Sequence, residues 1–201
     1  MKTATSLQAD LRWLLPVRSG QTAWIPGEAP ELEEALTRDG VRVIKSASLP
    51  TNQPDYLIAP MMEGHLTDKW LKTILMQPKS NCLVLIGFPH TPSLYKFKKR
   101  KTPGSHFYAL RHLRQIFDGS GWVIVTLYGV YDSLEHPRFT IPLESPAAVQ
   151  FFFASLFNAY TPSGRWLPRL APFFNAIGQP HVLFPGLILI ARKPAEVLEQ
   201  R

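Results

Sequence analysis

Cysteine is almost missing from this sequence of 201 residues, in which Cys82 is the only one. A single thiol excludes an internal disulfide framework and any metal site built from several cysteines. No apolar run reaches the roughly 18 residues that span a bilayer, and the first ten residues lack the apolar stretch of a secretory signal. We therefore expect a reduced, globular protein in the cytoplasm.

Sequence signatures of several enzyme classes are also missing. The chain has neither a P-loop nor the Gly-x-Ser-x-Gly turn that carries a nucleophilic serine in many hydrolases. Its six histidines include no His-x3-His pair, and Asp and Glu form no compensating cluster. We therefore expect no metal site. Internal repeats and low-complexity segments are missing as well.

Positive charge is present in excess, with a formal net charge of +7. Five of these charges lie within six residues, at Lys96, Lys98, Lys99, Arg100 and Lys101, and subtracting them leaves +2 for the rest of the chain. The excess positive charge therefore belongs to one segment. That segment could bind a phosphate-bearing ligand or an anionic membrane surface, and a solvated charged loop is the alternative. No recognition-helix or RNP pattern accompanies it, so we do not expect sequence-specific binding of nucleic acid.

Hydrophobic residues make up 45% of the chain, enough for the core of one domain spanning residues 1–201. Apolar periodicity predicts strands that alternate with helices, which implies a mostly parallel α/β sheet with a ligand crevice at the carboxyl ends of its strands. The predicted strands cover 23–25, 41–44, 55–59, 82–87, 122–128 and 187–191. The predicted helices cover 6–15, 30–39, 67–76, 105–117 and 147–160.

The order of these elements resembles that of class I S-adenosylmethionine-dependent methyltransferases. The resemblance covers roughly residues 20–194 and rests on the strand that begins at Asp55, the turn Gln77–Ser80, the apolar strand from Cys82 and the closing strand 187–191. It implies a Rossmann-like, doubly wound sheet of seven strands, mostly parallel, with an antiparallel last strand. It also implies S-adenosylmethionine as the cofactor.

The cofactor end departs from the family pattern. After its first strand the family has a loop rich in glycine, where this chain has one glycine, Gly27, between Pro26 and Pro30. At the end of the second strand the family favours an acid for the ribose hydroxyls, where this chain has Lys45 and Ser46. Two interpretations remain open. One is a divergent enzyme that transfers a methyl group to a small or amphipathic acceptor; the other is a non-catalytic binding or scaffolding subunit without the cofactor.

The resemblance and the strand ends together give the candidate site residues. His65 and His90 follow predicted strands and have side chains suited to a general base, although a polar loop or a tight turn would also explain them. Tyr128 is a candidate for the acceptor pocket and, with the lysine-rich segment, for substrate binding. The cofactor candidates are Gly27, Glu28, Pro60 and Met61.

Residues 144–180 form an insert rich in aromatic residues and proline before the last strand. Its helix is apolar almost all round, which predicts burial in an assembly, a lipid-like substrate pocket or a partner groove. We expect contact with a protein partner, a second copy of the chain or a membrane surface. The candidate interface residues are Phe151, Phe152, Phe153, Phe157 and Trp166. If Phe152 and Phe153 lie in that contact, replacing both with Ser should abolish association and leave the fold largely intact.

Overall fold

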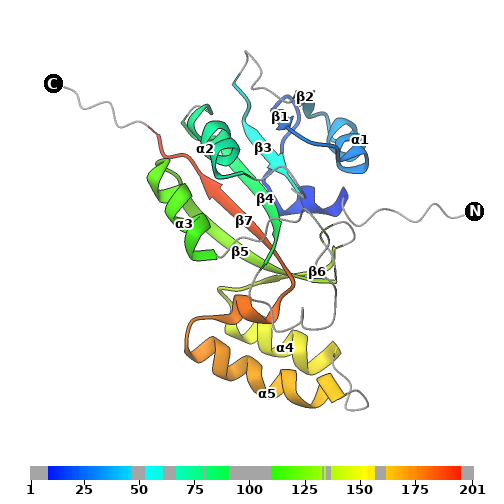
Figure 1. Cartoon of the computed structure of the whole chain (residues 1–201). Helices are drawn as coiled ribbons and strands as arrows, with labels where there is room; N and C mark the ends of the chain where they lie inside the picture. Colours follow the sequence, from blue (N-terminus) through cyan, green and yellow to red (C-terminus); the bar gives the residue numbers. More distant parts are fainter. Residues whose placement is uncertain are drawn as a thin grey trace, which may run out of the picture.

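A seven-stranded mixed sheet forms the centre of the computed structural model (Figure 1). The structure describes residues 9–46, 53–60, 67–78, 80–90, 110–132, 134, 137–156 and 162–195. The strands lie in the order β2-β1-β3-β4-β7-β5-β6. This arrangement confirms the predicted α/β sheet with an antiparallel last strand.

The first four strands run parallel to one another. They are β1 (Thr22–Ile25), β2 (Arg42–Lys45), β3 (Tyr56–Ala59) and β4 (Leu83–Pro89). All of β3 and most of β4 are buried, as expected for strands covered on both faces. The carboxyl ends of these strands therefore meet at one edge of the sheet, which we call the carboxyl edge.

The other three strands complete the sheet in antiparallel pairs. β7 (Gly186–Arg192) lies between β4 and β5 (Val123–Asp132) and runs antiparallel to both. β6 (Pro137–Pro142) pairs antiparallel with β5 at the sheet margin and is a strand that we did not predict. Proline lacks an N–H, so a strand that begins and ends with proline suits this marginal position.

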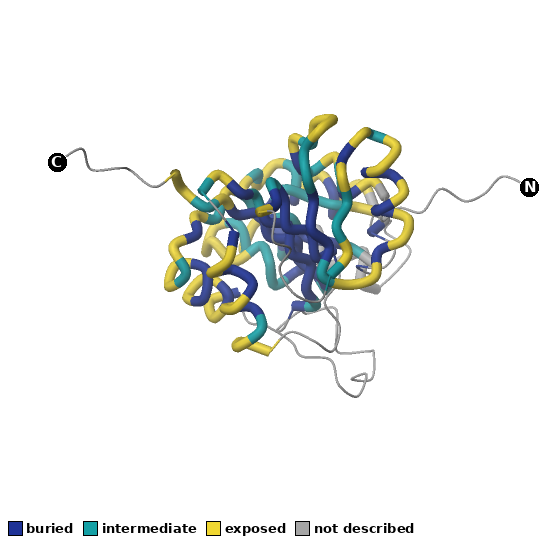
Figure 2. The backbone as a smooth tube through the Cα atoms, turned by 90° about the horizontal axis from the view of Figure 1, so that it is seen from above, coloured by how far each residue is buried: buried dark blue, intermediate teal, exposed yellow. Residues whose placement is uncertain are grey.

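Helices cover both faces of the sheet. The 3-10 helix η1 (Ala9–Leu14) and α1 (Pro30–Arg38) pack on one face, while α2 (Asp68–Met76) and α3 (Leu110–Gly119) pack on the other. Figure 2 shows the buried residues gathered in the central strands, with exposed segments around them. The hydroxyl of Thr67 accepts a hydrogen bond from the Trp70 N–H at 3.1 Å and so caps the start of α2. Among the described residues, no helix is both long and apolar enough to cross a membrane.

Two helices occupy the predicted insert, α4 (Pro146–Leu156) and α5 (Pro162–Ala176), and the 3-10 helix η3 (Pro180–Leu183) follows them. Figure 1 shows α4 and α5 beyond the end of the sheet at which β4 finishes. The side chains of Phe152 and Phe153 are 4% and 0% exposed, and both rings pack on Phe184 at centroid distances of 5.8 and 5.4 Å. Gly129 makes room for this packing, because a Cβ there would overlap the Phe184 ring.

This packing corrects part of the interface prediction. Phe152 and Phe153 belong to the chain's own core, so replacing both with Ser would disrupt the fold rather than leave it intact. Phe151 is 73% exposed and stays a candidate for contact with a partner. Phe157 and the side chain of Trp166 lie outside the described part of the structure.

Candidate functional site at the carboxyl edge

The loop that follows β1 presents two of the predicted cofactor residues to solvent. Gly27 and Glu28 are exposed, and a Cβ placed on Gly27 would have no atom within 4 Å. α1 begins directly after this loop, with Pro30 in its first turn. The loop therefore offers one accessible carboxylate, that of Glu28, beside open space.

Bonds within the protein link the end of β2 to β1 and to the start of α1. The Lys45 ammonium forms an ion pair with Glu33, a buried carboxylate that also accepts the Ala29 N–H at 3.3 Å. The Trp24 indole N–H donates to the Ser46 carbonyl at 2.8 Å, and the ring is fully buried. Together these bonds hold the first loop, the start of α1 and the end of β2 in one arrangement.

The end of β3 is closely packed against β4. Pro60 is buried, and a Cβ on Gly87 would clash with the Pro60 carbonyl oxygen. Glycine at position 87 is therefore required by the close approach of the two strands. The predicted cofactor residue Pro60 contributes buried backbone here, and Met61 lies outside the described residues.

Two histidines meet at the end of β4. The backbone N–H of His90 donates to the Pro185 carbonyl at 3.0 Å, and its side chain is only 1% exposed. The His90 and His181 rings contact each other edge to face, with centroids 5.1 Å apart and planes at 69°. Burial, reinforced by the positive charge of Arg114, lowers the pKa of His181 below its ordinary value of 6.5.

No pattern in the sequence singles out His181, since it lies 91 positions from His90 and next to a proline. Only the antiparallel pairing of β4 with β7 brings η3 to the end of β4. His181 is half-buried, whereas His90 is almost fully buried, so His181 is the more accessible imidazole of the pair. The other predicted base, His65, lies outside the described residues.

The remaining predicted site residues are only partly placed. Tyr128 is half-buried on β5, where it packs against the core cluster on the η1 and α1 side of the sheet. The lysine-rich segment Lys96, Lys98, Lys99, Arg100 and Lys101 lies outside the described residues. Within the described ranges, no group of three or more His, Cys, Asp or Glu side chains is arranged to hold a metal ion.

No protein-family model matches this sequence, and neither does any curated protein sequence. Solved structures do match it in fold. A SAM-dependent methyltransferase from Archaeoglobus fulgidus superposes with a TM-score of 0.56 at 16% identity, over 92% of both chains. The cyclase SpnF superposes with a TM-score of 0.55 at 15% identity, over 93% of this chain and 80% of its own.

The chain has the class I methyltransferase fold. At such low identity the similarity extends to the fold and no further. Because the proteins that share this methyltransferase fold include a cyclase, the fold by itself does not identify the reaction. The activity has to be argued from the residues at the carboxyl edge.

Proposed function

We propose that the chain is a methyltransferase that binds S-adenosylmethionine at the carboxyl edge and acts on a small or amphipathic acceptor. The observation that carries this proposal is the exposed carboxylate of Glu28, which follows β1 of a methyltransferase fold and lies next to Gly27, where no atom is within 4 Å of an added Cβ. A carboxylate accepts hydrogen bonds from hydroxyl and ammonium groups, and the cofactor has both. Gly27 and Glu28 are therefore the residues that would hold it.

The cofactor, when bound, supplies an electrophilic methyl group. The acceptor atom must lose a proton on methylation, and His181 is suited to take it, because its lowered pKa keeps the imidazole neutral at neutral pH. The almost fully buried His90 packs against that ring and holds its orientation. We therefore assign His181 the role of general base and His90 that of a positioning residue.

A second candidate function is a binding or scaffolding subunit that works without the cofactor. The contacts of Lys45 with Glu33 and of Trp24 with Ser46 favour it. They place a cation where the family has a ribose-binding acid and join the first two strand ends through the chain's own groups. Because these contacts already order the first two strand ends, the carboxyl edge needs no ligand to order it.

Calorimetric titration with S-adenosylmethionine and S-adenosylhomocysteine separates the two candidates. For the enzyme we expect saturable binding, and ~2.7 kcal/mol of added stability at 100 times the dissociation constant. Glu28→Gln should weaken binding about tenfold or more, because a hydrogen bond to a charged group contributes about 1.5–3 kcal/mol. Glu34→Gln is the matched control, since Glu34 is exposed on α1 and pairs with Arg38 at 2.7 Å.

Folded protein that shows no heat and no stabilisation at millimolar cofactor would overturn the proposal and leave the binding subunit. Binding with unchanged affinity in Glu28→Gln would instead contradict the role of Glu28.

A further inference from the structure

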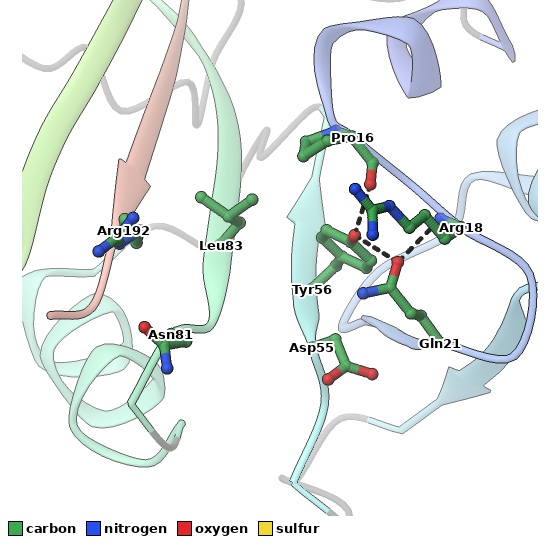
Figure 3. A pocket seen from close by; sticks show the side chains of 8 residues that line it. All are labelled: Pro16, Arg18, Gln21, Asp55, Tyr56, Asn81, Leu83 and Arg192. Carbon is green, nitrogen blue, oxygen red and sulfur yellow. Dashed lines mark hydrogen bonds between the residues drawn. The ribbon is translucent and has the colours of Figure 1, made fainter. Parts of the chain in front are cut away.

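A pocket lies at the opposite edge of the sheet, where β1, β3 and β4 begin (Figure 3). It has a volume of about 320 Å³, and polar and apolar atoms contribute equally to its lining. The lining residues are Pro16, Arg18, Gln21, Asp55, Tyr56, Asn81, Leu83 and Arg192. Because the length of the strands separates the edge at which they begin from the edge at which they end, this pocket is distinct from the candidate site at the carboxyl edge.

One wall of the pocket is fixed by hydrogen bonds around Gln21. Its side-chain Oε1 accepts the backbone N–H of Arg18 at 2.8 Å and lies 2.6 Å from the Tyr56 hydroxyl, which is also 2.8 Å from the Pro16 carbonyl. Burial raises the pKa of Tyr56, so the phenol stays protonated and donates within this wall. Arg18 is exposed at the same wall.

The opposite wall is fixed by strand pairing. Arg192 at the end of β7 is in register with Leu83 at the start of β4, and the Asn81 N–H donates to the Lys193 carbonyl at 2.8 Å. Figure 3 shows Arg192, Leu83 and Asn81 on one side, and Arg18, Tyr56 and Asp55 on the other. One arginine at the end of β7 and one in the segment between η1 and β1 therefore lie on two sides of one hollow.

The net charge of the lining is positive, since it contains two arginines, Arg18 and Arg192, and one carboxylate. That carboxylate, Asp55, accepts the Thr22 N–H through Oδ2 at 2.9 Å and so joins β1 to β3. Guanidinium groups bind carboxylates and phosphates by paired, charge-assisted hydrogen bonds. The amide side chains of Gln21 and Asn81 also line the pocket, Gln21 on the wall of Arg18 and Asn81 on the wall of Arg192.

We propose that this pocket binds a small organic anion through Arg18 and Arg192, by a carboxylate or phosphate group. Its volume is at the lower end of the range for small-molecule sites, which fits a single small metabolite. The site does not depend on S-adenosylmethionine, so it stands or fails separately from the proposed function.

Amide chemical shifts in the full chain, measured by NMR, test the proposal. We use inorganic phosphate and malonate as probes, with sodium chloride of equal ionic strength as the reference. Saturable shifts at Arg18, Asn81 and Arg192 are expected with at least one probe, and the probe that saturates identifies the group as phosphate or carboxylate. Arg18→Gln and Arg192→Gln should each weaken that binding at least fivefold, whereas Arg38→Gln, on the exposed face of α1, should not change it.

Shifts that rise linearly with both probes would overturn the proposal, as would equal affinity in Arg18→Gln, Arg192→Gln and the unmodified chain. The amide spectrum of each variant away from the pocket reports whether it is folded. If one variant fails to fold, the other still decides, because each arginine is required separately.

Discussion

His181 is a half-buried imidazole whose environment disfavours its charged form. The ring contacts His90 from β4, and Arg114 from α3 adds a positive charge nearby. Both burial and that charge lower its pKa, so the folded protein releases this proton more readily than the unfolded chain does. A residue that the sequence did not single out therefore makes stability depend on pH.

Stability should fall as the pH is lowered below about 6.5, because the unfolded chain then binds a proton that the folded chain does not. Above that pH both states have a neutral His181, and its contribution is fully present. In His181→Gln this part of the pH dependence should disappear. Guanidinium unfolding at pH 8 and pH 5.5 measures it, and an equal loss of stability in the variant and the unmodified chain would contradict the assignment.

At the scale of single elements, α4 shows how neighbouring phenylalanines differ in role. Phe152 packs against Phe184, Tyr131 and Phe139, whereas Phe151, at the preceding position of the helix, is exposed. Because nearly every position of α4 is apolar, the sequence pattern does not distinguish the buried face of the helix from its exposed face. The sequence predicted an apolar helix that is covered by an assembly, a lipid-like pocket or a partner groove, and it offered no means of telling which face meets the chain's own sheet.

Phe152→Ala should lower the free energy of unfolding by about 3–5 kcal/mol, as expected when a buried aromatic ring leaves a cavity. Phe151→Ala is the matched control on the same turn and should change stability by less than about 0.5 kcal/mol. Chemical denaturation of both variants measures the difference. Equal losses in the two would show that α4 does not pack as the structure has it.

Two elements escaped prediction for the same physical reason, which is their proline content. β6 is bounded by Pro137 and Pro142, and α5 continues through Pro168 and Pro172. Proline removes a backbone donor and usually ends a regular element, so these stretches resembled loops. Pairing with β5 overrides this local effect of proline in β6, and packing against α4 overrides it in α5.

At the scale of the whole molecule, six of the seven strands and their order along the chain were readable, because each of the six is a short apolar run between turns. The position of β7 between β4 and β5 was not readable, since it depends on pairing between residues 97 to 109 positions apart for β4 and 56 to 69 positions apart for β5. That pairing brings His181 to His90 and Arg192 to Leu83. Both ligand-binding proposals therefore depend on contacts that only the folded sheet creates.

The α4–α5 end of the molecule carries the remaining proposal, which is association. Phe151, Phe173 and Ile177 are 73%, 57% and 48% exposed, respectively, and none of them is needed to cover the core cluster. Exposed apolar side chains gathered on one part of a protein mark contact surfaces. We keep these three residues as candidates for contact with a partner, and a second copy of the chain is the partner that we test.

Sedimentation over a range of concentrations tests this association. The unmodified chain should approach a dimer as its concentration rises. The double variant with Phe151→Ser and Phe173→Ser should remain a monomer, because it lacks the two rings whose burial would offset the entropy lost on association. Met76→Ser is the control, since Met76 is 66% exposed at the end of α2, on another part of the molecule. An unmodified chain that stays monomeric, or a double variant that dimerises equally well, would rule out the surface as a self-association site.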